Sequence, residues 1–216
     1  MKVFIFDFDG TITMVDTIDL ILKIPDEDQV WEIEEEWNQG KITSYECMKS
    51  QTRYLEGITT NRILQHLKQH SRLDPGFPKL ANTLEEMGFY TILLSEGYDL
   101  SIEFHDVQKQ IKEIYSSKLS IDDRRLTGKL KVSNERRRKY NKECIGCCIC
   151  KVDFLHQLGR RLPVTKSFAV GDGRSDECLF QSVDVSFSLN PELKATYQVR
   201  NLSEVLEVLV NSEALN

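Results

Sequence analysis

The chain has 216 residues, of which 28 are Lys or Arg and 34 are Asp or Glu, so its formal net charge is -6. An acidic total argues against a dedicated nucleic-acid-binding protein, because neutralising phosphates requires a basic surface. The 40% hydrophobic and 29% charged residues exclude global disorder, and no apolar run approaches the ~20 residues needed to cross a bilayer. The apolar start, residues 3–6, is too short for the core of a secretory signal, so the expected location is cytoplasmic.

At about 150 residues per domain, this length fits one domain with a large insertion as well as it fits two domains. Residues 2–6 form a short apolar run, which predicts a strand buried on both faces of a parallel sheet. The pattern then becomes helical, and breakers at Pro25, Gly40 and Gly57 divide it into four expected helices. Residues 14–76 are therefore predicted to form an all-helical block.

After a cluster of breakers at residues 74–76, the chain alternates between helices and strands. Helices are expected over 77–87, 175–183 and 203–210, and strands over 90–94, 167–170 and 185–189. A β-hairpin is expected over 114–122 and 130–132, with its turn at Thr127-Gly128. This alternation predicts an α/β fold with a parallel sheet.

The first expected strand ends in two carboxylates, Asp7 and Asp9, followed by Gly10 and Thr11. In an extended backbone, residues two apart point the same way, so both carboxylates are expected on one side of the strand end. Two like charges held together cost energy unless a cation binds them or their pKa rises. A solvated Asp-Gly turn is the alternative interpretation of this segment taken alone.

Two further polar segments follow later strands. Asp172 and Asp176 stand four residues apart on a strand-to-helix turn, where both can face the first carboxylate pair. Oxygen ligands of this kind suit Mg²⁺, although two acids at a helix N-terminus are also explained by the helix dipole. Ser95, with the backbone amides of Glu96 and Gly97, offers donors suited to a phosphate oxygen, or simply a helix N-cap.

Taken together, these segments resemble the four motifs of the haloacid dehalogenase superfamily of phosphohydrolases. Asp7-Phe8-Asp9-Gly10-Thr11 matches the first motif, Ser95 ends the second, Lys151 is the candidate for the third, and Gly171-Asp172 through Asp176 matches the fourth. The resemblance implies a Rossmann-like three-layer catalytic core over residues 1–13 and 77–216. The helical block over 14–76 falls where the family's type-one cap is inserted.

The resemblance also implies a role for each matched residue. Asp7 would be the nucleophile that forms an aspartyl phosphate, and Asp9 would protonate the leaving alcohol and then activate water. A carboxylate repels a phosphate dianion, so positive charge has to be supplied, by Mg²⁺ and by the ammonium of Lys151. The expected metal site comprises Asp7, Asp9 through its backbone carbonyl, Asp172 and Asp176, with Asp176 orienting Lys151 or a metal-bound water. The expected substrate-binding residues are Thr11, Asp16, Ser95, Glu96, Gly97 and Lys151.

Residues 7–17, DFDGTITMVDT, are similar to the branch that holds phosphoserine phosphatase and the methionine-salvage 2-hydroxy-3-keto-5-methylthiopentenyl-1-phosphate phosphatase. The chain departs from both at the second motif, which reads Ser-Glu-Gly where Ser-Gly-Gly is usual. Glu96 therefore either places a carboxylate near the phosphate site or points away from it. Asp16 either shapes specificity or caps the helix that begins at Thr17.

The segment before Lys151 is rich in cysteine, with four within seven residues: Cys144, Cys147, Cys148 and Cys150. This spacing supplies one conventional zinc knuckle rather than two. Free thiols, a local disulfide and a metal site are therefore equally acceptable interpretations of the segment.

Two other features have plain structural interpretations. The basic run over 136–139 is interpreted as a solvated face rather than as a guide for an anionic substrate. Trp31 and Trp37 are interpreted as packing inside the helical block, and not as a platform for a ligand.

The leading hypothesis is a Mg²⁺-dependent phosphatase of a small phosphomonoester that works through phospho-Asp7, with no nucleic-acid or membrane partner. A signalling receiver also gathers acids, a hydroxyl group and a lysine around an aspartyl phosphate, but it places no acidic pair after the lysine. The remaining alternative is a catalytically silent or zinc-stabilised binding protein on the same scaffold.

Overall fold

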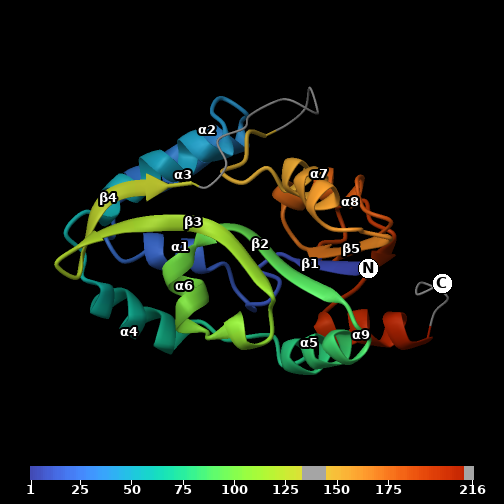
Figure 1. Ribbon diagram of the computed structural model, residues 1–216. Helices are drawn as coiled ribbons and strands as arrows, with labels where there is room; N and C mark the ends of the chain where they lie inside the picture. Colours follow the sequence, from blue (N-terminus) through green and yellow to red (C-terminus); the bar gives the residue numbers. More distant parts are fainter. Residues whose placement is uncertain (133–144, 212–216) are drawn as a thin grey trace.

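The computed structural model describes residues 1–132 and 145–211 (Figure 1). Within these residues, seven strands form one sheet in the order β4-β3-β2-β1-β5-β6-β7. The strands are β1 (Lys2–Phe6), β2 (Tyr90–Tyr98), β3 (Glu113–Asp122), β4 (Arg125–Lys131), β5 (Lys166–Gly171), β6 (Val185–Ser188) and β7 (Tyr197–Gln198). Neighbours pair in parallel except β3 and β4, which form an antiparallel hairpin. The mostly parallel sheet confirms the predicted α/β class.

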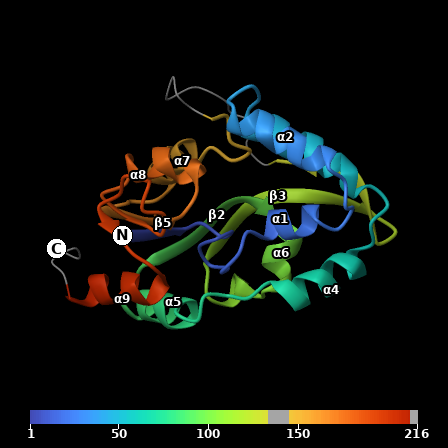
Figure 2. The same cartoon turned by 180° about the vertical axis from the view of Figure 1, so that it is seen from behind.

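Helices cover both faces of the central strands (Figures 1 and 2). On one face lie α5 (Phe77–Glu86) and α9 (Leu202–Asn211), and on the other lie α7 (Lys151–Arg161) and α8 (Glu177–Phe180). This arrangement is the three-layer core that the sequence predicts.

The alternation of side chains along β1 explains why both faces need a cover. Phe4 and Phe6 belong to the apolar cluster that includes α5 and α9, whereas Val3 and Ile5 belong to the cluster on the α7 and α8 side. Successive residues of a strand point to opposite faces, so an apolar run buries both. Asp7 is the next residue with the parity of Val3 and Ile5, which points it toward the face that α7 covers.

Between β1 and β2, where every residue is described, the chain forms α1 (Thr17–Leu22), α2 (Gln29–Asn38), α3 (Ser44–Thr52) and α4 (Thr60–His70). Local capping explains two of the starts. Asp16 accepts hydrogen bonds from the amides of Ile18 and Asp19 at 2.8 and 3.1 Å, and Thr43 forms a capping box with Glu46. The all-helical character of this block is confirmed.

The helical block has its own apolar cluster, which also includes the β3–β4 hairpin. Leu119 and Leu126 of the hairpin are buried in this cluster with Ile21, Leu55 and Leu67 of the block. Figure 1 shows α2 and α3 on one side of the hairpin and α4 on the other. Two distant parts of the chain thus share one core, which fixes the helical block above the carboxyl ends of the central strands.

The predicted hairpin exists, but its turn lies elsewhere. The chain reverses at Asp123 and Arg124, which have φ of 41° and 62°, while Gly128 lies inside β4. Gly128 also has a positive φ, and a Cβ there would lie 3.2 Å from the carbonyl oxygen of Arg53. This glycine therefore reflects a close approach of two backbones rather than the hairpin turn, which is why the sequence pattern was misleading.

Other element boundaries also differ from the predictions. β2 does not end at residue 94 but continues through an irregular register to Tyr98, so the next helix, α6 (Asp99–Phe104), begins after Gly97 rather than at Ser95. The helix expected over 175–183 is a 3₁₀ turn (Arg174–Asp176) followed by the short α8. The sequence analysis did not predict α6, α7 or β7.

Candidate active site

Three adjacent central strands bring the motif residues together. In the sheet, β1 lies between β2 and β5. Asp7 directly follows β1, Ser95 lies in the irregular last part of β2, and Asp172 directly follows β5. The Asp7 amide still donates to the Val170 carbonyl at 3.0 Å, so the position of Asp7 is set by the ladder itself. Crevices at the carboxyl ends of parallel strands are where open α/β sheets bind their ligands.

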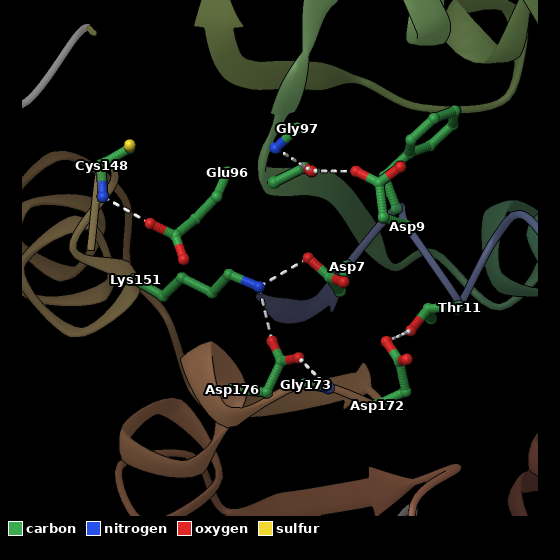
Figure 3. A network of polar contacts seen from close by, with 12 residues as sticks. Asp7, Asp9, Thr11, Glu96, Gly97, Cys148, Lys151, Asp172, Gly173 and Asp176 are labelled. Atoms are coloured by element: carbon green, nitrogen blue, oxygen red, sulfur yellow. Dashed lines mark hydrogen bonds and ion pairs between the residues drawn. The ribbon is translucent and has the colours of Figure 1, made fainter. Parts of the chain in front are cut away.

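Lys151 is the centre of the polar network in Figure 3. It is the first residue of α7, and its Nζ donates to Asp7 Oδ1 and to Asp176 Oδ1, both at 2.6 Å. The side chain of Lys151 is 1% exposed. Asp176 also accepts a hydrogen bond from the Gly173 amide at 3.2 Å, which fixes its carboxylate against the lysine.

Burial and charge shift the pKa values of Asp7, Lys151 and Asp172. Burial raises the pKa of Asp7 well above its ordinary value, Lys151 opposes that rise, and Asp176 and Asp172 add to it. Burial alone would lower the pKa of Lys151, but the Asp176 and Asp7 carboxylates raise it above its usual range. Burial, together with the charge of Asp176, raises the pKa of Asp172 to about 6. Three carboxylates around one ammonium leave an excess of negative charge.

This excess fits a divalent cation. Asp7, Asp172 and Asp176 each offer a carboxylate oxygen, and these atoms lie within 4.8 Å of one another. No other group of acids, cysteines and histidines in 1–132 and 145–211 is arranged in this way. Carboxylate oxygens are the ligands that Mg²⁺ prefers, so the residues present fit the ion that the sequence predicts.

Asp9 forms hydrogen bonds to other residues than Asp7 does. The chain leaves the extended conformation after Phe8, whose carbonyl accepts from the amides of Thr11 and Thr13 at 3.3 and 3.0 Å. Asp9 Oδ1 accepts from the amide of Thr17 at 2.9 Å and from its hydroxyl, and Oδ2 accepts from Ser95 at 3.4 Å. The two aspartates therefore face different partners, as Figure 3 shows.

Burial raises the pKa of Asp9, although its hydrogen bonds from Thr17 oppose the rise. The space around this carboxyl group depends on Gly97, because a Cβ there would lie 2.0 Å from Asp9 Oδ2. The Gly97 amide donates to Ser95 Oγ at 2.8 Å, so it is bonded within the strand. A carboxyl group with a raised pKa keeps its proton more readily than a solvated one, which suits it to proton transfer.

Thr11 positions Asp172. Its hydroxyl donates to Asp172 Oδ1 at 3.0 Å, and its side chain is buried. Gly10 adopts a φ of +68°, and a Cβ there would lie 2.2 Å from Asp172 Oδ2. The turn after β1 thus needs glycine both for its conformation and for the approach of Asp172.

Glu96 links three parts of the chain. Its carboxylate accepts from the hydroxyl of Ser44 on α3 at 3.1 Å and from the amide of Cys148, which precedes α7. Burial raises the pKa of Glu96, while these hydrogen bonds oppose the rise. Its carboxyl group therefore points toward protein partners at the edge of the cavity described next.

A cavity of about 170 Å³ lies between the strand ends and the helical block. Of the sequence-predicted residues, those that line it are Asp7, Asp9, Asp16, Ser95, Glu96, Gly97 and Asp172. Thr11 and Lys151 do not line the cavity, but they bond to Asp172 and Asp7, which do. Asp176 does not line it either, and it bonds to Lys151. Asp16 both caps α1 and lines the cavity, so both interpretations of this residue hold in part.

Two residues of the site were not predicted from the sequence. Thr17, the partner of Asp9, carried only the signal of a polar residue at a helix start. Trp37 was interpreted as internal packing, but it lines the cavity, and the guanidinium of Arg174 lies 5.2 Å from its ring centre. Trp31 does pack against the cluster of the helical block, as predicted.

The described cysteines before Lys151 have separate surroundings. Cys148 is buried with its Sγ 3.4 Å from Met48 Sδ, and the Cys150 side chain caps α7. Cys147 and Cys150 line a second, smaller cavity together with Cys178. Cys144 and the basic run over 136–139 lie outside the described residues. Among the helices that the structure describes, none combines the length and the apolar composition of a membrane span.

Comparisons with known proteins place this geometry in a family. The profile of haloacid dehalogenase-like hydrolases matches residues 4–181. A phosphoserine phosphatase of Idiomarina loihiensis is 27% identical, with 98% of this chain and 94% of that protein covered. One from Methanocaldococcus jannaschii is 23% identical, with coverage of 96% and 97%. A solved phospho-aspartyl intermediate analogue of phosphoserine phosphatase has a TM-score of 0.77 at 21% identity, covering 95% of this chain and 97% of that one.

The profile spans most of the chain, the two relatives match nearly its whole length, and the structural likeness shows the same fold. The fold, the acidic cluster at the strand ends and these matches agree with one another. The chain therefore belongs to the haloacid dehalogenase-like hydrolase family, as a hydrolase similar to phosphoserine phosphatases.

Proposed function

We propose that this hydrolase is a Mg²⁺-dependent phosphatase that cleaves a small phosphomonoester through a phosphorylated Asp7. The observation that carries the proposal is the group formed by the buried Asp7, Lys151 and Asp176 and the half-buried Asp172 at the end of the central strands. It combines a carboxylate nucleophile, a fixed ammonium and an excess of negative charge that a divalent cation would neutralise.

In the proposed first step, an Asp7 carboxylate oxygen attacks phosphorus while the bond from phosphorus to the ester oxygen breaks. Lys151, bonded to Asp7 and Asp176, stabilises the negative charge of the transferring phosphoryl group. When bound by Asp7, Asp172 and either Asp176 or the Asp9 backbone carbonyl, Mg²⁺ would offset the repulsion between the phosphate dianion and these acids.

Asp9 is proposed to transfer the protons of both steps. Its raised pKa favours the protonated form that gives a proton to the leaving alcohol, and the resulting carboxylate then takes a proton from the water that hydrolyses phospho-Asp7. Thr17 and Ser95 hold the Asp9 carboxyl group in place through three hydrogen bonds. General acid and base catalysis of this kind contributes about 10²- to 10⁴-fold.

The helical block is proposed to act as a cap over the cavity. In this division, residues 14–76 form the cap and residues 1–13 and 77–216 form the catalytic core. The support is that the cavity is lined from both sides, by Asp7, Ser95 and Asp172 and by residues of α1, α2 and α3. A cavity of about 170 Å³ suits a small metabolite rather than a macromolecule.

Phosphate release from p-nitrophenyl phosphate and from a panel of metabolite phosphates, with Mg²⁺ and with EDTA, tests this function. We expect Mg²⁺-dependent turnover that falls by about 10³-fold or more in Asp7→Asn. Asp122→Asn, an exposed position at the end of β3, should retain the wild-type rate. Equal rates for wild type and Asp7→Asn would refute the mechanism, and no turnover by folded protein would favour a silent binding protein.

A further inference from the structure

The cavity has two walls of different chemistry. The wall formed by the strand ends holds the reacting groups, and the wall formed by the helical block faces the part of a substrate beyond its phosphate. Three residues of this second wall are acidic: Asp16, Asp19 and Glu34. Among the described residues that form it, none is Lys, Arg or His.

These acids come from two helices and share one environment. Asp16 and Asp19 lie at the start of α1, and Glu34 lies on α2 across the cavity. Burial raises the pKa of Asp19, and burial followed by the charge of Asp19 raises the pKa of Glu34, although the charge of Lys23 opposes both rises and a hydrogen bond with Gln51 opposes the second. Asp16 Oδ1 accepts hydrogen bonds from two amides at the start of α1. The carboxylate of Asp16 is a third negative charge on the same wall of the cavity. A cation in this space would relieve both the burial cost and the mutual repulsion.

The rest of the wall is apolar and suits a small organic cation better than a hydrated metal ion. Trp37, Met48 and Leu22 line the cavity together with the acids. Organic ammonium groups are bound in proteins by acids combined with aromatic faces. The acids are also continuous with the cavity that contains Asp7, so a cation bound there can belong to the substrate.

Among the described residues that line the cavity, Arg174 is the one cation. It is two residues after Asp172, its side chain is exposed, and its guanidinium lies 5.2 Å from the ring centre of Trp37 on α2. Three acids of the helical block therefore share the cavity with one exposed cation. A carboxylate on the leaving alcohol would meet a wall with an excess of negative charge.

We propose that the cavity selects phosphomonoesters whose alcohol carries an ammonium group and no carboxylate, with Asp19 and Glu34 as the residues that recognise the positive charge. This inference rests on the proposed phosphatase activity and narrows its substrate class. It separates this chain from the reaction named for its phosphoserine phosphatase relatives, because phosphoserine carries a carboxylate beside its ammonium group.

Two pairs of substrates test the proposal in the wild-type enzyme with Mg²⁺. O-phosphoethanolamine and n-propyl phosphate differ mainly by an ammonium in place of a methyl group, and O-phosphoserine adds a carboxylate to the first. We expect kcat/KM for O-phosphoethanolamine to exceed that for each of the other two by at least about tenfold, the effect of 1.4 kcal/mol. Equal kcat/KM for O-phosphoethanolamine and n-propyl phosphate would overturn the proposal. A higher kcat/KM for O-phosphoserine than for O-phosphoethanolamine would also overturn it.

Variants on α2 locate the recognition. Glu34→Gln should reduce the preference for O-phosphoethanolamine over n-propyl phosphate by about fivefold, mainly by raising KM for O-phosphoethanolamine. Glu35→Gln, the adjacent acid that bonds to Gln39 on the exposed side of α2, is the matched control. The same loss of preference in both variants would contradict a specific role for Glu34.

The two proposals fail in different ways. If the enzyme releases phosphate from p-nitrophenyl phosphate through Asp7 but does not discriminate between the paired substrates, only the substrate class is wrong. If no phosphate ester is hydrolysed by folded protein with Mg²⁺, the phosphatase function itself is wrong.

Discussion

Lys151 holds its charge in a buried position because two carboxylates surround it. Its Nζ lies 2.6 Å from both Asp7 and Asp176, and its side chain is 1% exposed. Transferring an ammonium group from water to the protein interior costs free energy, and only carboxylates at hydrogen-bond distance offset this cost. The lysine consequently has a fixed position and a fixed charge, which are the two properties that its proposed role in phosphoryl transfer requires.

Lys151→Met should lower both stability and activity. It leaves two buried carboxylates without their cation, so we expect a loss of about 3 kcal/mol in the free energy of unfolding and at least a hundredfold loss in kcat. Urea unfolding and phosphate release measure the two effects. Lys112→Met, which removes an exposed pair with Glu85, should cost less than about 1 kcal/mol. Equal losses in the two variants would contradict the role assigned to burial.

Gly97→Ala tests the space beside Asp9. The added methyl group would lie 2.0 Å from Asp9 Oδ2, so the carboxyl group has to move away from Thr17 and Ser95. We expect kcat for p-nitrophenyl phosphate to fall by about 10²-fold, within the range of lost general acid or base catalysis. Gly159→Ala on α7, where no neighbour lies within 4 Å, should leave kcat unchanged and stabilise the helix slightly. Unchanged kcat in Gly97→Ala would show that the Asp9 position does not limit the reaction.

At this scale the sequence predicted which residues meet but not how they are oriented. Asp7, Lys151, Asp172 and Asp176 were predicted as one site from motif order, and the structure brings them together. The hydrogen bonds of Asp9 to Thr17 and Ser95 depend on the turn after Phe8, which the sequence pattern does not encode.

At the scale of elements, Glu96 joins β2, α3 and the segment before α7. One carboxylate accepts from Ser44 and from the Cys148 amide, and the α3 amides of Ser44 and Tyr45 donate to the carbonyls of residues 145 and 146. The helical block is therefore attached to the segment that positions Lys151. This attachment explains how an inserted block keeps a defined place above the sheet.

Glu96→Ala should weaken this attachment, and Glu96→Gln should largely preserve it. Alanine leaves the buried Cys148 amide without its acceptor, which costs about 1–3 kcal/mol, whereas glutamine keeps one carbonyl oxygen. Urea unfolding gives the stability, and hydrogen exchange at the Cys148 amide reports the local bond. If exchange at this amide is equally slow in both variants, the Glu96 carboxylate does not hold the segment.

Most helices and strands could be predicted because each follows from residues inside it or directly before it. Apolar runs marked β1 and β5, and capping residues marked α1 and α3. The hairpin turn was misplaced because Gly128 serves a contact with Arg53, far away in the chain. A glycine in the sequence indicates an unusual backbone conformation or a close contact. Only the structure shows which neighbour requires it.

At the scale of the whole molecule, the site places acids where burial opposes their charge. Asp172 has a pKa of about 6 in the fold against an ordinary value of 3.8. Between these values the folded state binds more protons than the unfolded state, so stability falls as pH rises through this window. The size of this loss is about 3 kcal/mol for Asp172 in metal-free protein.

This linkage predicts how Mg²⁺ and pH act on stability. In EDTA, Tm should fall between pH 4 and pH 6.5, and Mg²⁺ should raise Tm more at pH 7 than at pH 5, where protons compete for the carboxylates. A ligand at a hundred times its Kd contributes about 2.7 kcal/mol. Asp172→Asn should flatten the pH dependence and weaken the response to Mg²⁺. If Tm depends on pH and on Mg²⁺ in the same way in wild type and in Asp172→Asn, Asp172 is not the cause of either effect.

The central claim is that the phosphoryl group passes through Asp7. In Asp9→Asn, p-nitrophenyl phosphate needs no general acid to leave, while hydrolysis of the intermediate loses its base, so the phosphoenzyme should accumulate with Mg²⁺. Acid quenching followed by borohydride, which reduces an acyl phosphate to homoserine, marks the residue for peptide mass spectrometry. The account predicts homoserine at position 7, dependent on substrate. Release of p-nitrophenol with Asp7 unmodified and another residue marked would contradict it.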